Sequence, residues 1–436
     1  MQARLNLGTT ASVGALNDIS VTDAASLPRH RWYHFKEAFS PAVVARAIDD
    51  TARDEGIFVL DPFSGSGTVP LTSVAEGHRA VSFEVNPFLA FVSRTKMLQL
   101  KRSELENNVA KVLDGVDAGA PSPLESFSTF SEAGGAQKWL FNGEVLRAFE
   151  GGWESTSSMY SAARDLLRLS LIVAAMDVCN ATKDGKCLRY RSNWQDRAYG
   201  RTDFRAAFER RVRVIRDDLE RSPLSSTVAD TQVHQADARV EMDGYLEQAR
   251  FDLCVTSPPY LNSFDYTDVY RPELFLGKFV RSMKQLRALR MRTLRSHTQA
   301  KWEDPKESEF GPNFKRSYDE IVRHADSLWS PRIPKMIRAY FEDMRRVLRS
   351  LRRLAAPEAS VWIVVSTSAY AGVVIPVDLI IADIGTQEGW YLREVSLMRH
   401  LRRVPVQQWD LLSENSDLSK PYLRESIVIL DAKPHH

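Results

Sequence analysis

The sequence predicts an α/β fold on a mostly parallel sheet with an antiparallel last strand and mainly helical insertions. Short apolar runs, each the length of a central strand, recur along the chain and end in an acid or a turn. After the first run come a glycine-containing turn and a helical pattern, the order that forms an open α/β sheet. The predicted strands are 56–60, 80–83, 231–234, 251–255 and 360–365, with a final antiparallel pair at 390–395 and 426–430.

A loop with two glycines follows the first predicted strand, with the sequence DPFSGSGT at 61–68. Glycine lets a ligand approach the backbone closely and adopts positive φ without strain. A P-loop would need a lysine after the second glycine, and a dinucleotide fingerprint would need a third glycine where Pro70 stands. We therefore expect a cofactor-binding role for Asp61, Pro62, Phe63, Gly65, Ser66, Gly67 and Thr68.

Polar residues also follow the second predicted strand. Glu84 ends that strand, and Asn86 comes two residues later. An acid at this place in a βαβ unit can accept hydrogen bonds from the ribose hydroxyls of a bound nucleotide. We expect Glu84 and Asn86 to line the same site as the glycine loop.

A rigid turn, TSPPY at 256–260, follows the strand at 251–255. Two successive prolines fix φ and remove backbone N–H donors. The turn offers the hydroxyl of Ser257 and the carbonyl of Pro258 as hydrogen-bond acceptors. Tyr260 adds a flat aromatic face on which a base can stack.

The turns at 61–68 and 256–260 together resemble motifs I and IV of the S-adenosylmethionine-dependent amino-methyltransferases that act on nucleic acid bases. Residues 84–90 resemble motif II of that family, and residues 30–41 resemble motif X, which closes over the methionine end of the cofactor. The Ser-Pro-Pro-Tyr form is most often met in the DNA cytosine-N4 branch. The resemblance implies a three-layer, Rossmann-like methyltransferase fold with S-adenosyl-L-methionine as cofactor. It covers the sheet and leaves the insertions unexplained.

The same resemblance implies transfer of a methyl group to the N4 amine of a flipped cytosine, without metal or covalent enzyme intermediate. That amine is a poor nucleophile because its lone pair is delocalised into the ring, so acceptors for its hydrogens are needed to turn the lone pair toward the methyl group. The resemblance assigns this catalytic role to the motif IV residues, Ser257, Pro258, Pro259 and Tyr260. The family also implies that Asp237, after the strand at 231–234, bonds the adenine amine of the cofactor.

The cysteines argue against one related reaction. Cytosine C5 methylation uses a cysteine nucleophile, usually preceded by proline, and this chain has no Pro-Cys dipeptide. Its three cysteines show no metal-binding or disulfide spacing, so we expect no metal site and a protein of a reducing cytosol. The resemblance to this DNA methyltransferase family implies that the cytosol is prokaryotic. The longest apolar stretch, 169–176, is too short to cross a bilayer, and we expect neither a signal segment nor a membrane partner.

Basic residues gather outside the predicted sheet. The net charge is only +2 over 436 residues, so affinity for double-stranded DNA has to come from local clusters. Segment 281–297 carries six lysines and arginines and no acid, and residues three apart share a helix face. A solvated helix face is the alternative interpretation. A second basic region, 189–221, is mixed with acids, which favours internal ion pairs. We expect phosphate contacts from Arg281, Lys284, Arg287, Arg290 and Arg295.

The predicted organisation alternates the sheet with insertions. Residues 1–100 hold motifs X, I and II, residues 230–262 hold motifs III and IV, and residues 331–436 complete the methyltransferase domain. Residues 101–229 form a helical insertion and residues 263–330 a basic one, and each is a candidate target-recognition region. Many cytosine-N4 enzymes have a permuted motif order in which the Pro-Pro motif comes first. This chain has the unpermuted order, in which motifs X, I, II and III, the last around Asp237, precede the Pro-Pro motif IV. Because the large insertion precedes motif III here, the sequence leaves open which insertion reads the target.

The function that the sequence favours is a site-specific DNA cytosine-N4 methyltransferase of a restriction-modification or related defence system. A cognate restriction endonuclease is then a candidate partner. Adenine-N6 methylation of DNA and methylation of a base amine in RNA stay open as alternatives. From a different class, a non-catalytic DNA-binding subunit is also open, although the intact motifs argue against it.

Overall fold

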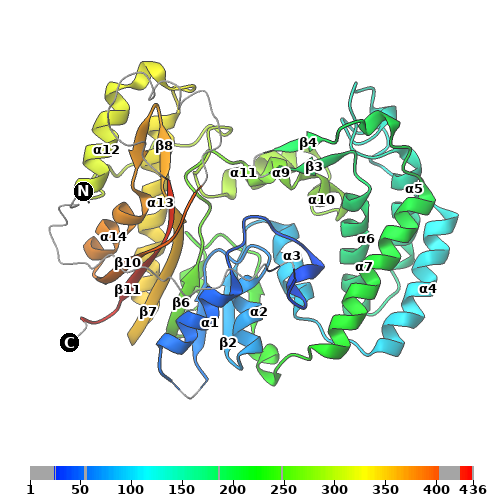
Figure 1. Ribbon diagram of the computed structural model, residues 1–436, viewed down its shortest axis with the longest axis horizontal. Coiled ribbons are helices and arrows are strands. Elements are labelled where there is room, and N and C mark those ends of the chain that lie inside the picture. Colours follow the sequence, from blue (N-terminus) through cyan, green and yellow to red (C-terminus); the bar gives the residue numbers. More distant parts are fainter. Residues whose placement is uncertain are drawn as a thin grey trace.

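A computed structural model gives the fold for residue 24 and for residues 26–53, 56–184, 187–246, 249–401 and 423–434. Its main sheet has seven strands in the order β10-β11-β7-β6-β1-β2-β5 (Figure 1). The strands are β1 (Phe58–Asp61), β2 (Arg79–Phe83), β5 (Gln232–His234), β6 (Phe251–Thr256), β7 (Ala355–Ser366), β10 (Tyr391–His400) and β11 (Arg424–Asp431).

The strand directions confirm the predicted fold class. Strands β5, β2, β1, β6 and β7 pair in parallel, and β11 runs antiparallel between β7 and β10. This is a Rossmann-like methyltransferase sheet with an antiparallel strand near one edge. Every strand expected from the sequence is present, with ends that differ by a few residues, because apolar runs locate a buried strand better than they locate its ends.

Helices cover both faces of this sheet and make it the middle of three layers. Along β7, Val361, Ile363 and Val365 point to one face, while Trp362 and Val364 point to the other. This alternation follows from the two-residue period of a strand. The first face packs against α13 (Ile333–Leu354) and α14 (Val377–Gln387), and the second against α1 (Pro41–Asp50) and α2 (Thr68–Ala75).

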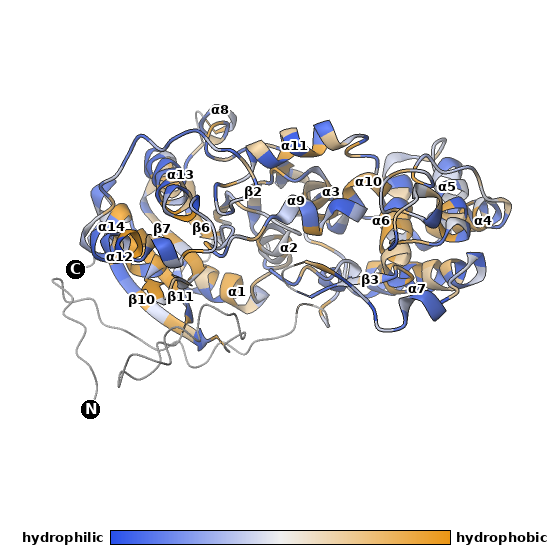
Figure 2. Ribbon diagram, turned by 90° about the horizontal axis from the view of Figure 1, so that it is seen from above, coloured by the Kyte–Doolittle hydropathy of each residue, from blue (hydrophilic) through white to orange (hydrophobic). Residues whose placement is uncertain are grey.

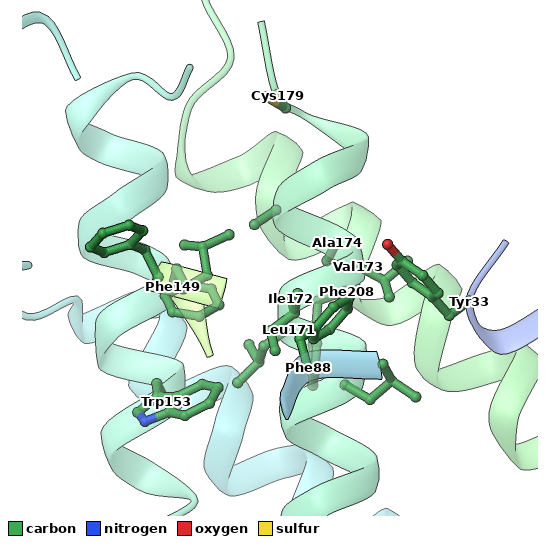
Figure 3. Packing of buried hydrophobic residues seen from close by; sticks show 14 of the residues in the cluster. Tyr33, Phe88, Phe149, Trp153, Leu171, Ile172, Val173, Ala174, Cys179 and Phe208 are labelled. Atoms are coloured by element: carbon green, nitrogen blue, oxygen red, sulfur yellow. The ribbon is translucent and has the colours of Figure 1, made fainter. Parts of the chain in front are cut away.

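The predicted helical insertion forms a bundle at one end of the elongated molecule (Figures 1 and 2). Its helices are α4 (Arg102–Ala118), α5 (Gly143–Ser155), α6 (Ser161–Asp177) and α7 (Arg201–Arg221), and it includes the hairpin of β3 (Ala181–Lys183) and β4 (Leu188–Tyr190). Figure 3 shows the centre of its core, where Phe88 of α3 (Pro87–Lys96) packs among side chains of α6 and α7. The insertion therefore shares one hydrophobic core with a helix of the methyltransferase part.

Short elements complete the chain after β5. The helices are α8 (Met242–Tyr245), α9 (Tyr266–Val269), α10 (Arg271–Leu276), α11 (Met283–Arg292) and α12 (Pro312–Arg323), and β8 (Ser368–Tyr370) pairs with β9 (Val373–Ile375). Single 3-10 turns occur at His30–Trp32, Glu132–Gly134, Trp194–Asp196, Ser226–Asp230 and Ala325–Ser327. None of the helices in the described ranges has the length and apolar character needed to span a membrane.

Candidate active site

A cavity of about 290 Å³ is lined by residues that directly follow β1, β2, β5 and β6. After β1 the chain builds the sheet toward β2 and β5, whereas β6 lies on the other side of β1. The edge between β1 and β6 is thus the switch point at which open α/β sheets bind ligands. The cavity wall brings together the glycine loop and the Ser-Pro-Pro-Tyr turn, which lie far apart in the sequence.

The wall contains most of the residues that the sequence singles out. All four predicted catalytic residues line it, Ser257, Pro258, Pro259 and Tyr260, as do the predicted cofactor residues Pro62, Phe63, Gly65, Glu84, Asn86 and Asp237. The remaining predicted cofactor residues are buried and do not line the described cavity wall, namely Asp61, Ser66, Gly67 and Thr68.

Asp61 connects the two turns. Its Oδ1 accepts hydrogen bonds from the Thr256 hydroxyl at 2.7 Å and from the Phe63 N–H at 2.9 Å. The carboxyl group is almost completely buried, and burial raises its pKa to about 7, against the effect of these two bonds. Asp61 therefore fixes the glycine loop relative to the end of β6.

The two loop glycines have different tasks. Gly67 has φ of 89°, and a Cβ there would lie 2.5 Å from Oγ of Ser93, so it lets α3 pack against the loop. Gly65 has φ of 51°, and a Cβ there would lie 3.0 Å from the ring of Phe35. Both Gly65 and Phe35 line the cavity. Of the two glycines, only Gly65 lines the cavity.

Glu84 and Asn86 supply polar groups to the cavity wall. Glu84 Oε2 accepts from the Gly65 N–H and Oε1 accepts from the Asn86 N–H, each at 2.8 Å. Burial raises the pKa of Glu84 to about 7, and these backbone bonds act in the opposite direction. The amide nitrogen of Asn86 is buried without a hydrogen-bond partner among the described residues, so a donor remains for a bound ligand.

Asp237 lines the cavity with both carboxylate oxygens already bonded to Arg239. Arg239 Nε donates to Oδ1 at 2.9 Å, and its terminal nitrogen donates to Oδ2 at 2.7 Å. The same guanidinium reaches the buried Asp343 of α13 at 2.7 Å. Oδ1 also accepts the Arg239 backbone N–H at 3.1 Å, whereas Oδ2 accepts only one bond from the described residues and keeps capacity for a ligand amine.

The residues that resemble motif X contribute the N-terminal part of the wall through 35–39. The Tyr270 hydroxyl donates to the Glu37 carboxylate, and the Tyr33 hydroxyl donates to Glu273 Oε1 at 3.0 Å. Lys183 of the β3–β4 hairpin donates to the Tyr33 hydroxyl at 2.8 Å. This segment is thereby held against α10 and against the helical insertion.

The basic segment forms α11 and the loop that follows it. Arg281, Lys284 and Arg287 are exposed, while Leu286 and Leu289 are buried in the core. Arg290 is an exception, because its Nε lies 2.6 Å from Asp265 Oδ2 and its side chain is only 18% exposed.

The prediction that Arg295 contacts phosphate is wrong. Its side chain is 9% exposed and its guanidinium lies 2.5 Å from Glu342 and 2.7 Å from Asp343. Both acids belong to α13, and the buried ion pairs leave Arg295 unavailable to a phosphate. Its role is to fasten the loop after α11 to α13.

Sequence reasoning missed several polar and aromatic wall residues. Arg239 and Tyr266 lie within six positions of predicted residues, so proximity to a motif was an available signal. His297 ends the basic segment, two positions after Arg295, whereas Arg399 and Glu425 had no such signal. Among the residues that the structure describes, no group of three or more His, Cys, Asp or Glu side chains could hold a metal ion.

Comparison with known proteins shows similarity to methyltransferases. The chain is 24% identical over 405 residues to the Type II methyltransferase M.BsoBI of Geobacillus stearothermophilus, covering 83% of this chain and 78% of the relative. It is also 24% identical over 417 residues to the Type II methyltransferase M.AvaI of Nostoc, covering 86% and 81%. No protein-family model matches the chain.

Similar solved structures include TrmN from Thermus thermophilus, with 9% identity and a TM-score of 0.29, over 91% of this chain and half (50%) of that chain. The rRNA methyltransferase aviRa from Streptomyces viridochromogenes has 11% identity and a TM-score of 0.30, over 95% and 92% of the two chains. Because these scores are low, the fold assignment rests on the strand order described above.

Proposed function

We propose that this chain is a site-specific DNA methyltransferase that transfers a methyl group from S-adenosyl-L-methionine to the N4 amine of cytosine. The observation that carries the proposal is the meeting of the glycine loop and the Ser-Pro-Pro-Tyr turn in one cavity. The similarity to Type II methyltransferases over most of both chains supports a place in a restriction-modification system. A cognate restriction endonuclease in the same prokaryotic cytosol is the partner that such a place implies.

The cavity residues suit the proposed cofactor. Gly65 lines the cavity without a side chain, so a ligand can approach its backbone, and the free amide nitrogen of Asn86 can donate to a ligand oxygen. Glu84 follows β2 in the position from which a carboxylate accepts ribose hydroxyls. Asp237, at the end of β5, can accept a bond from an adenine amine. When bound, the cofactor supplies an activated methyl group on a sulfonium sulfur.

The catalytic turn prepares the target amine as nucleophile. The Ser257 hydroxyl oxygen and the Pro258 carbonyl accept the two amine hydrogens, which turns the nitrogen lone pair toward the methyl group. The ring of Tyr260 stacks on the base, which has to leave the duplex to enter the cavity. The nitrogen would gain the methyl group while the sulfur keeps the electron pair of the broken carbon–sulfur bond, and the methylated amine would then release one proton to solvent. This arrangement lowers the barrier through orientation of the reacting atoms.

DNA contact is assigned to exposed basic residues of α11, Lys284 and Arg287, and to Arg281, which lies just before the helix. In Figure 1, α11 lies between the sheet and the helical bundle, close to α9. Arg292, at the end of the same helix, lines the cavity. A phosphate backbone on this helix would therefore lie near the opening through which a base enters. The helical insertion 101–229 and the basic insertion 263–330 are both candidate recognition regions.

Mass spectrometry of nucleosides tests the reaction. DNA from a host that expresses the protein should contain N4-methylcytosine, which is absent from the same host with an empty vector, and 5-methylcytosine should not increase. Detection of N6-methyladenine as the only new modification would refute cytosine as the target base but would be consistent with the proposed site. Methylation of RNA alone would refute the choice of DNA.

A substitution at Tyr260 tests whether this cavity is the site. Tyr260→Ala removes a stacking surface that contributes roughly 1–3 kcal/mol per base in comparable contacts. It should lose most of the turnover while S-adenosyl-L-methionine binds as before. Full methyl transfer by the folded variant would place the reaction elsewhere.

A further inference from the structure

The hydroxyl of Tyr260 is bound to a residue that belongs to no motif. It donates a hydrogen bond of 2.8 Å to Oε1 of Glu425, which lies 165 positions later in the chain. Glu425 is at the start of β11, is only 7% exposed and lines the cavity together with Tyr260. Arg399 of β10, the strand partner of Glu425, donates to its other oxygen at 2.8 Å.

The direction of the Tyr260–Glu425 bond is well defined. Burial raises the pKa of the Tyr260 phenol well above its usual value, and the nearby Glu425 carboxylate raises it further, while a hydrogen bond with Ser257 acts in the opposite direction. The phenol therefore keeps its proton and acts as the donor, and Glu425 acts as the acceptor. Bonds of this kind, with an ionised acceptor, are stronger than bonds between neutral groups.

Glu425 is itself held firmly by its neighbours in the chain. Arg424 donates to both oxygens of Asp378, at 2.7 and 3.2 Å, and the Ser426 hydroxyl donates to Asp378 at 2.8 Å. Asp378 is completely buried at the start of α14. The backbone on both sides of Glu425 is thus fastened to the body of the protein, and the carboxylate is a fixed point for the tyrosine.

We propose that Glu425 is a positioning residue for methyl transfer, which holds the Tyr260 ring in the orientation that receives the target base. This inference rests on the proposed function. A tyrosine ring that is free to turn would have to be ordered each time a base binds, at a cost in conformational entropy. Because Glu425 orders the ring beforehand, the base is stacked in line with the Ser257 and Pro258 acceptors as it enters.

A double-mutant cycle between positions 260 and 425 tests this role. Tyr260→Phe keeps the ring and removes the hydroxyl, and Glu425→Ala removes the acceptor. Each should lower kcat about fivefold, as loss of one hydrogen bond does. The double variant should be no slower than the worse single variant, because both changes break the same bond. Cofactor affinity should stay within about twofold in all three.

A conservative variant and a matched control complete the test. Glu425→Gln keeps a carbonyl acceptor for the tyrosine, so kcat should return to within about twofold of the wild-type value. Glu358→Gln changes an exposed glutamate of β7 outside the cavity wall, and it should leave kcat unchanged. The assay measures transfer of tritiated methyl groups from S-adenosyl-L-methionine to unmodified bacteriophage DNA.

The outcomes separate this inference from the proposed function. Wild-type protein that binds S-adenosyl-L-methionine and transfers no methyl group to DNA refutes the function, and the positioning role with it. An active wild type with multiplicative losses, about 25-fold in the double variant, would show independent residues and overturn the role of Glu425 alone. A Gln variant as slow as the Ala variant would also overturn it.

Discussion

Replacement of Gly65 by valine is the sharpest test of the cofactor site. The residue has φ of 51°, and its Cβ position is 3.0 Å from the ring of Phe35, which also lines the cavity. Valine adds two more carbons beyond that point. The Gly65 N–H also donates to Glu84, so a shift of the loop would disturb the carboxylate assigned to the ribose.

The Gly65→Val change should affect both the free energy of folding, through backbone strain, and the affinity for the cofactor. Any side chain at positive φ costs about 1–2 kcal/mol of folding free energy. A hydrogen bond to a charged group contributes about 1.5–3 kcal/mol, which corresponds to a roughly 10- to 100-fold change in affinity. Because the valine side chain would also occupy volume next to the cavity, we expect Gly65→Val to weaken S-adenosyl-L-methionine binding at least about 100-fold.

Gly77 provides the matched control. It has φ of 86°, and a Cβ there would meet nothing within 4 Å. Gly77→Val therefore carries the backbone strain without the contact, and should keep cofactor affinity within about twofold. Calorimetric titration measures both affinities, and circular dichroism checks that both variants fold. A folded Gly65→Val protein with wild-type affinity would refute the placement of the cofactor at this loop.

Two further predictions concern pH and DNA. The folded-state pKa of Asp61 is raised from 3.8 to about 7, so its stabilising contribution is full below pH 4 and is lost as pH rises toward and through 7. Asp61→Asn keeps the Oδ1 acceptor and does not titrate. Its free energy of unfolding relative to wild type should therefore be higher at pH 8 than at pH 4, by on the order of 2–4 kcal/mol. Urea unfolding curves in which the difference between the two proteins does not change with pH would contradict this. Joint neutralisation of Lys284 and Arg287 should reduce the salt slope of DNA binding by about one unit per lost phosphate contact. The equivalent change of Arg210 and Arg213, exposed and three apart on α7, should leave that slope unchanged, and equal effects from both pairs would refute a specific role for α11.

The sheet was predictable because its signals are local. A strand buried on both faces needs an apolar run, and the chain must turn where the run ends. The residues after β1, β2, β5 and β6 could therefore be assigned to one edge before any coordinates. Glu84 and the Ser-Pro-Pro-Tyr turn line the cavity for this reason.

Partnerships between distant side chains could not be predicted in the same way. Arg295 belongs to the same basic segment as Lys284, yet one is buried and the other exposed. What separates them is Glu342 and Asp343, which a later helix brings to within 2.7 Å of the Arg295 guanidinium. Charge spacing along a segment does not contain that information. The contact between Glu425 and Tyr260 could not be predicted for a similar reason, since it depends on how the last two strands pair in the sheet.

The position of Asp61 changes how the first motif is understood. Its sequence neighbourhood predicts contact with a cofactor, whereas its carboxylate bonds to Thr256, directly before Ser257. A change at Asp61 would therefore move the glycine loop and the catalytic turn relative to each other. The acid of the first motif thus connects the glycine loop to the end of β6, and the next two residues, Pro62 and Phe63, line the cavity. Since methyl transfer depends on alignment of donor and acceptor, we expect Asp61 to affect the proposed reaction without facing the cavity.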